Sequence, residues 1–299
     1  MRTFIAITLL MMAVALPAAV PTLPPTTAQA LDALTAAERT FAKTARVKGW
    51  RAAFLEFFSP DAIALAPDPT SAVARLKTQP VRPFAEEELT WEPRAGDIAA
   101  SGELGWLTGP SIFIDHTAQN PSPTYGNYLS VWKKATDGSW RVFIDVGTRA
   151  SSPVSFPSWF THVTAVPRYR GTELPSQSAA RLLDADRELN SALSSSAVAR
   201  EYLLRIVPRA RLHRVGTDQP VSVGADEIAR WFAGNPEPML AKTSASEAAA
   251  SGDLGYTYGR YELSGASRQH GAYVRVWSRQ ADGRWCVAAD VTVPVHDAS

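Results

Sequence analysis

The chain has 299 residues, of which 45% are hydrophobic and 20% are charged, and its formal net charge is +1. This composition is that of a globular protein and excludes a disordered chain. Because the charge is nearly balanced and no basic run occurs, we expect neither nucleic acid nor an anionic membrane surface as a partner. The length is enough for about two domains of ordinary size.

The first segment predicts export. Arg2 precedes an apolar run at 4–20, and the residues Ala-Gln-Ala at 28–30 fit a small-residue cleavage site. These features are typical of a secretory signal peptide. The alternative is a membrane anchor, but the run has 17 residues and contains Pro17, which makes it short for a span. We therefore expect a signal peptide at 1–30 and a periplasmic or secreted protein with no membrane contact after cleavage.

Two helices are predicted next. Thr35 and Glu38 have the spacing of a capping box, which predicts that a helix begins there. Gly49 interrupts the helical pattern. A second short helix with aromatic residues on one face then follows from Trp50, and Pro60 is expected to end it.

Strands are predicted in the rest of this first unit. One runs over 106–114, and a hairpin turns at Asp137-Gly138, a pair that tolerates the backbone of a tight turn. Before the turn, Tyr128 and Trp132 share one face, while Leu129 and Val131 share the other. After it, alternation places Trp140, Val142, Ile144 and Val146 on one face, and Arg141, Phe143 and Asp145 on the opposite face.

The chain then repeats itself. The block AASGELGWLTG at 99–109 returns as AASGDLGYTYG at 249–259, with seven of eleven positions identical. Residues 126–146 and 271–291 are identical at ten of twenty-one positions. The offset falls from 150 to 145 between the blocks, so the first copy carries five extra residues in the polar loop 115–124. The repeat predicts two units of the same fold rather than a solenoid.

The repeat also sets the expected domain boundaries. Residues 31–150 form the first domain and residues 177–299 the second. Residues 151–176, rich in proline, serine and aromatic residues, are interpreted as the linker. We expect the two domains to pair as an intramolecular pseudo-dimer.

The order of elements and the two repeated blocks resemble the nuclear transport factor 2-like superfamily, and within it an exported bacterial subgroup of SnoaL-like proteins. The resemblance implies an α+β fold: two repeated cone-shaped domains, each with N-terminal helices packed on a curved antiparallel sheet and a pocket at the open end. The superfamily includes ketosteroid isomerases, polyketide cyclases, dehydratases and non-catalytic modules. The fold alone therefore leaves function open.

Asp145 and Asp290 are the candidate catalytic residues. They occupy the same place in the last strand of each unit, among apolar neighbours. A carboxyl group in an apolar pocket can act as an acid or donate a hydrogen bond near neutral pH. The alternative is that each carboxylate binds backbone amides or faces water.

Aromatic residues of the strands are the candidate ligand-binding residues, since they supply apolar area with a polar tip. The alternative is that they belong to the core. They are Trp106, Tyr128, Trp132, Tyr256, Tyr258, Tyr273 and Trp277. The single cysteine, Cys286, cannot form an internal disulfide, and no Cys/His cluster predicts a metal site or a cofactor.

Three functions remain open on the sequence. The first is binding of a small, largely apolar molecule in one or both cone pockets. The second is an enzyme of the isomerase, cyclase or dehydratase type that uses Asp145 or Asp290. The third is a protein-interaction module whose pockets are filled by side chains.

Overall fold

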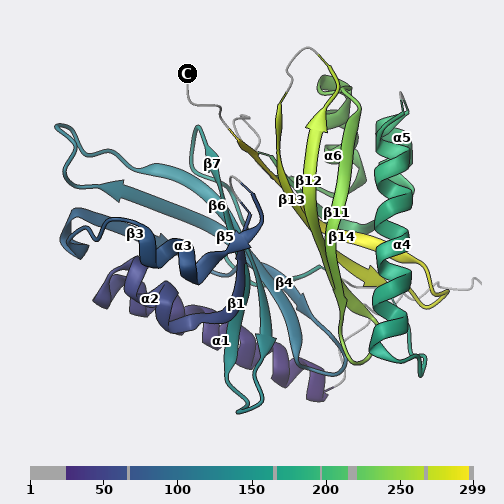
Figure 1. The fold of residues 1–299 in the computed structure, drawn as a ribbon, viewed down its shortest axis with the longest axis horizontal. Coiled ribbons are helices and arrows are strands. Elements are labelled where there is room, and N and C mark those ends of the chain that lie inside the picture. Colours follow the sequence, from purple (N-terminus) through teal and green to yellow (C-terminus); the bar gives the residue numbers. More distant parts are fainter. Residues whose placement is uncertain are drawn as a thin grey trace, which may run out of the picture.

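The computed structural model describes residues 25–65, 68–163, 167–195, 197–214, 221–265 and 269–295. The apolar run at 4–20 lies outside these residues. Two units of helices and strands follow each other along the chain, and Figure 1 shows them side by side.

In the first unit the helices precede most of the strands. The helices are α1 (Pro25–Lys48), α2 (Trp50–Phe57), α3 (Ala72–Thr78) and the short 3-10 helix η1 (Phe84–Glu86). The strands are β1 (Phe58–Ala64), β2 (Thr70–Ser71), β3 (Glu87–Trp91), β4 (Ala95–Ile98), β5 (Leu104–Asp115), β6 (Thr124–Lys134), β7 (Trp140–Ala150) and β8 (Thr161–His162). They form one sheet in the order β2-β1-β7-β6-β5-β4-β8, and β3 also pairs with β5.

The second unit repeats this plan. Its helices are α4 (Pro175–Leu193), α5 (Val198–Leu203) and α6 (Gly224–Gly234). Its strands are β9 (Ile206–His213), β10 (Val221–Val223), β11 (Met239–Ala248), β12 (Leu254–Leu263), β13 (His270–Arg279) and β14 (Trp285–Val295). They form a second sheet in the order β10-β9-β14-β13-β12-β11.

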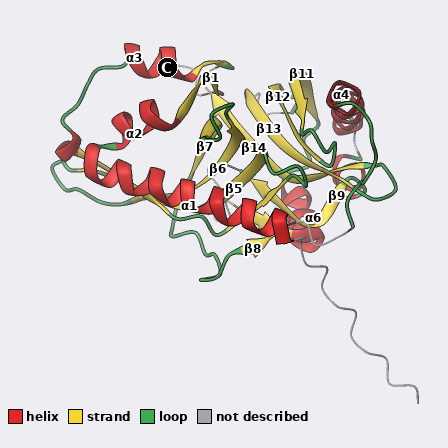
Figure 2. Ribbon diagram, turned by 90° about the horizontal axis from the view of Figure 1, so that it is seen from below, coloured by secondary structure: helices red, strands yellow, loops and turns green. Residues whose placement is uncertain are grey.

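The predicted α+β fold of two repeated cones is confirmed. In each unit the long first helix lies across one face of a curved sheet, as Figure 2 shows for α1. One detail differs from the prediction, because the sheets are not wholly antiparallel. Strand β1 runs parallel to β7, and β9 runs parallel to β14.

The first helix begins earlier than predicted. Since α1 starts at Pro25, Thr35 and Glu38 lie in its middle, and the predicted capping box is wrong. The hydroxyl of Thr35 donates to the carbonyl oxygen of Leu31 at 2.8 Å, a bond made inside helices. Glu38 instead turns into the core. The break at Gly49 is confirmed, and its φ of 88° is one that glycine adopts without strain.

Pro60 was expected to end a helix, but it lies inside strand β1, and its counterpart Pro208 lies inside strand β9. The register of β1 against β7 and that of β9 against β14 both shift near the proline. The ladder of hydrogen bonds is therefore already interrupted where proline has no backbone N–H to donate.

A bulge changes the face pattern of the last strand in each unit. The pairing of β7 with β6 shifts between Val142 and Ile144, so β7 carries an extra residue there. The pairing of β14 with β13 shifts in the same way between Val287 and Ala289. The predicted faces of β7 are therefore wrong. Val142 joins the core inside the cone, and Asp145 points to the same side instead of the opposite one.

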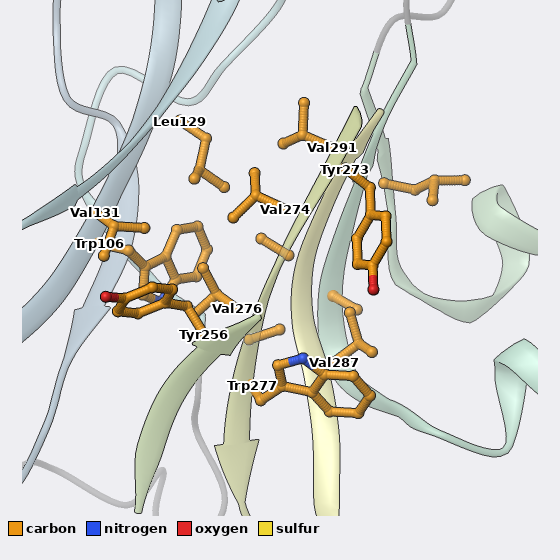
Figure 3. Packing of buried hydrophobic residues seen from close by; sticks show 14 of the residues in the cluster. Trp106, Leu129, Val131, Tyr256, Tyr273, Val274, Val276, Trp277, Val287 and Val291 are labelled. Carbon is orange, nitrogen blue, oxygen red and sulfur yellow. The ribbon is translucent and has the colours of Figure 1, made fainter. Parts of the chain in front are cut away.

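The two sheets pack face to face. One cluster of buried hydrophobic residues joins both units, and Figure 3 shows its centre. From the two sheets it includes Trp106, Leu129 and Val131 on one side and Tyr256, Val274 and Val276 on the other. Each sheet thus has its own helices on one face and the other sheet on the second face. This arrangement explains why both faces of β6 and β13 are buried along most of their length.

The repeated turns at 99–103 and 249–253 meet at this interface. The hydroxyls of Ser101 and Ser251 are 2.7 Å apart. The carboxylate of Asp253 accepts a hydrogen bond at 3.2 Å from the backbone N–H of Ala100. The carboxylate of Glu103 accepts one at 2.7 Å from the backbone N–H of Ala250. The two turns therefore bind each other reciprocally, with approximate two-fold symmetry.

The segment between the units also contributes to this contact. Arg168 is largely buried and forms ion pairs with Asp97 of the first unit and Asp253 of the second, the latter at 3.3 Å. Because α4 begins at Pro175, the last residues of the predicted linker 151–176 belong to a helix.

Candidate functional sites in the two cones

The open end of the second unit contains a pocket with a volume of about 330 Å³. It lies between α6, the end of α4 and the strands β11, β12 and β14. Arg214, which follows β9, is the one cation among the described residues that line it, and its guanidinium lies 5.2 Å from the centre of the Trp231 ring. The apolar lining includes Leu193, Val198, Trp231, Phe232, Met239 and Leu263.

Asp290 lies beneath this pocket and is fully buried. Its carboxylate is 3.1 Å from the guanidinium of Arg214 and 3.1 Å from that of Arg275, and it accepts a hydrogen bond at 3.2 Å from Tyr202. Burial alone raises the pKa of Asp290, but the two guanidinium groups outweigh it and hold that pKa below its usual value. Asp290 is therefore an ionised partner of two arginines.

The same network continues to the first helix of the unit. Arg275 donates to Asp186 of α4 at 2.8 Å and to the side-chain oxygen of Asn190 at 2.6 Å. Asp186 also accepts hydrogen bonds from Tyr273 at 2.6 Å and Thr257 at 3.0 Å. The interior of the second cone is thus filled by paired polar groups, below an open apolar mouth.

The first cone has a different interior. Glu38 of α1 has no exposed surface. It accepts hydrogen bonds from the indole N–H groups of Trp91 at 2.7 Å and Trp132 at 2.8 Å, and from the hydroxyl of Ser130 at 2.6 Å. Burial raises the pKa of Glu38, and these hydrogen bonds offset that effect only in part. No basic side chain among the described residues pairs with this carboxyl group.

Asp145 is half-buried beside a cavity of about 180 Å³, lined by the aromatic rings of Trp50, Phe54 and Phe58. Burial raises the pKa of Asp145 well above its usual value, and the charge of Glu38 raises it further. No hydrogen bond from the described part of the chain opposes this shift. Asp145 therefore stays protonated, and so neutral, up to a higher pH than Asp290.

Tyr128 lies in the same cone. Its hydroxyl is buried and has no hydrogen-bond partner within the described ranges. Burial raises its pKa well above the usual value, and the charges of Glu38 and Asp145 add to the shift. Two acids and a tyrosine with an unsatisfied hydroxyl thus gather in the first cone.

The structure divides the predicted aromatic residues between two places. Tyr128, Trp132, Tyr273 and Trp277 point into the cones, and Tyr128 and Trp132 share a face as the alternation along their strand predicted. Trp106, Tyr256 and Tyr258 lie on the opposite sheet faces, toward the interface between the units, where they line neither cone. The four inward residues are buried in the cores of the cones and do not line the cavities of about 330 and 180 Å³.

Several residues of these sites were not predicted from the sequence. Glu38 was assigned to a cap, and Asp186, Arg214 and Trp231 were not singled out. One signal was available: at the offset of 148 that aligns the N-terminal halves, Glu38 falls on Asp186. Two acids at equivalent positions of two helices indicate a shared buried role.

Among the described residues, no helix is long and apolar enough to cross a membrane. Within the same ranges, no group of three or more His, Cys, Asp or Glu side chains could hold a metal ion.

No family model and no curated protein matches this chain. Solved structures similar to it include a ketosteroid isomerase-like protein from Erwinia carotovora atroseptica SCRI1043, with 13% identity and a TM-score of 0.34, covering 40% of this chain and 96% of that one. A nuclear transport factor 2-like superfamily protein from Salmonella enterica has 14% identity and a TM-score of 0.33, covering 42% and 94%. The CaMKII hub of S. rosetta has 15% identity and a TM-score of 0.34, covering 40% and 95%.

Proteins described as nuclear transport factor 2-like and ketosteroid isomerase-like are thus among the solved structures that show a resemblance to this chain, as the sequence led us to expect. At these identities and TM-scores it concerns the fold and carries nothing about activity or ligand.

Proposed function

We propose that this chain is an exported tandem-domain protein whose second unit binds a small, largely apolar molecule. The observation that carries the proposal is the pocket of about 330 Å³ at the open end of that unit. Its wall is mostly apolar, and the polar residues that line it are Arg214, Asn235, Glu237, Gln269 and Thr292, with the phenol of Tyr261. Concave sites of this size and composition are typical of small-molecule binding.

The charge at the bottom of the pocket restricts the ligand. Arg214 already donates to Asp290 at 3.1 Å and to the carbonyl oxygen of His213 at 2.9 Å. Its charge is balanced within the protein, so it offers a polar contact rather than a free counter-ion. A molecule with an apolar body and one polar group therefore fits better than a strongly anionic one.

A titration with N-phenyl-1-naphthylamine, a neutral apolar fluorophore with one polar amine, tests this proposal. The Leu263→Trp variant adds bulk at the half-buried mouth of the pocket, and Leu240→Trp adds the same bulk at an exposed site on β11. We expect saturable binding that Leu263→Trp weakens about tenfold, or roughly 1.4 kcal/mol, and that Leu240→Trp leaves unchanged. Binding that neither variant affects would refute this use of the pocket.

A second candidate function, acid–base catalysis of the isomerase, cyclase or dehydratase type, applies to the first unit. The observation that favours it is Asp145, a carboxyl group with a raised pKa beside an aromatic cavity. The test is exchange of the α-protons of a small cyclic ketone with deuterium, followed by NMR. Exchange above the buffer rate that is lost in Asp145→Asn supports this function, and exchange at the buffer rate excludes it for such ketones.

Export and pairing of the units are part of the same proposal. A cut after Ala30 would remove the first residues of α1, including Thr27, which is 3% exposed. The mass of the protein recovered from the periplasm will locate the cut, and recovery of the intact chain from the cytoplasm would argue against export. The reciprocal hydrogen bonds of the turns at 99–103 and 249–253 support an intramolecular pseudo-dimer.

A further inference from the structure

The two cones keep the same pair of acids. Glu38 and Asp186 occupy equivalent positions on the first helix of each unit, and Asp145 and Asp290 occupy equivalent positions on the last strand. The residue between them on the neighbouring strand is different. It is Ser130 in the first unit and Arg275 in the second, at the offset of 145 that aligns the hairpins.

In the second cone the arginine joins the acids. Arg275 is 2.8 Å from Asp186 and 3.1 Å from Asp290, and all three side chains are fully buried. A guanidinium group thus fits between the helix acid and the strand acid of this fold. It supplies the positive charge that two buried carboxylates require.

In the first cone that cation is missing. Ser130 is short, and its hydroxyl donates to Glu38. Within the described residues, no side chain forms an ion pair with Glu38 or Asp145. Asp145 also borders a cavity with aromatic walls, at the side of the cone where an outside molecule can reach it.

We propose that the first unit binds a small organic cation, an ammonium or guanidinium group on an apolar body, with Asp145 as its counter-charge. The bound group would supply the charge that Arg275 supplies in the second unit. The rings of Trp50, Phe54 and Phe58 suit such a cation, since aromatic faces attract positive charge. A cavity of about 180 Å³ fits a body of one ring, because an apolar cavity of about 150 Å³ binds benzene. This inference is independent of the function proposed for the second unit.

Binding should release a proton. Burial and the charge of Glu38 favour the protonated form of Asp145 in the free protein, while a cation favours the ionised form. The other groups that face this site are Tyr128 on β6 and the exposed Arg75 on α3. Affinity for a cation should therefore rise with pH through the titration of Asp145.

Isothermal titration calorimetry of the full chain with benzylamine, benzyl alcohol and benzoate tests the proposal. We expect benzylamine to bind at least about tenfold more tightly than either of the others. Measured in two buffers of different ionisation enthalpy, its binding should release a proton. Equal or tighter binding of benzyl alcohol or benzoate, proton uptake, or no binding of benzylamine would each overturn the proposal.

Three variants test whether the cation binds at Asp145. Asp145→Asn should weaken benzylamine binding about tenfold and abolish the proton release. Arg75→Gln should strengthen it by a factor of about two, because a like charge at the rim is removed. Ser130→Arg should abolish it by supplying an internal guanidinium. If Ser130→Arg does not fold, the opposite effects of the first two variants still decide, and an unchanged affinity in Asp145→Asn overturns the assignment.

Discussion

Asp145 and Asp290 occupy equivalent positions, yet their surroundings push their pKa values in opposite directions. Burial raises the pKa of Asp145, while Arg214 and Arg275 lower that of Asp290 despite its burial. The difference arises from two arginines of the second unit, Arg214 after β9 and Arg275 at the position where the first unit has Ser130. These two residues therefore make the site an ion-pair network in the second cone, while in the first cone Asp145 lies without such a partner beside a cavity.

The raised pKa of Asp145 predicts a stability change in Asp145→Asn. A carboxyl group with a higher pKa in the folded chain stabilises the fold fully below its unfolded pKa, and this contribution is lost as pH rises through the folded pKa. At pH values above the folded pKa, each pKa unit of upward shift lowers the free energy of unfolding by about 1.4 kcal/mol. Asp145→Asn should therefore be more stable than the parent near neutral pH, by thermal unfolding. The exposed Asp32→Asn is the control, and equal effects of both changes would contradict the prediction.

Arg275 should be the residue on which the second cone most depends. Arg275→Met leaves two buried carboxylates without this cation, and breaking a buried pair typically costs about 3–5 kcal/mol. Urea unfolding at neutral pH should show a loss of that order. Since Asp290 has a lowered pKa, the network stabilises the fold above the unfolded pKa and loses its effect as pH falls, so the loss should shrink in acid. A loss that is the same at both pH values would argue against this network.

Among the strands, neighbouring backbone segments of each sheet approach closely at two equivalent glycines. A Cβ atom at Gly109 would overlap the carbonyl oxygen of Glu92, and one at Gly259 would overlap that of Lys242. Gly109→Ala and Gly259→Ala should each cost about 1–3 kcal/mol in urea unfolding, the usual cost of overpacking. Gly234→Ala, which would meet no neighbour, is the control. A cost confined to one of the two glycines would mean that the two close approaches are not equivalent.

The repeat made most of the fold predictable. Two copies of one sequence block must form the same turns, and the turns at Gly138 and Gly283 have the positive φ angles that Asp-Gly pairs predict. The faces of β7 could not be predicted, because one extra residue in a strand reverses the alternation beyond it and leaves no mark in the sequence. The role of Glu38 was hidden for another reason, since its partners Trp91 and Trp132 are distant in the chain.

At the scale of the whole molecule, the two units share one hydrophobic cluster and should unfold together. Trp106 lies in this cluster, between the sheets, with no exposed surface. Calorimetry should show a single transition for the parent. Trp106→Ala should cost about 3–5 kcal/mol and separate the transition into two, because the shared contact is lost. Two separate transitions in the parent would show that the contact is too weak to couple the units.

A native mass spectrum of the full chain, purified under mild conditions, decides whether the open cone of the second unit holds a small apolar molecule. We predict a mass above that of the polypeptide by one small molecule, which organic solvent releases and which Leu263→Trp no longer carries. A spectrum of the bare polypeptide, together with no saturable binding of apolar probes, would contradict this binding. That result would leave protein contacts as the better account of the second unit.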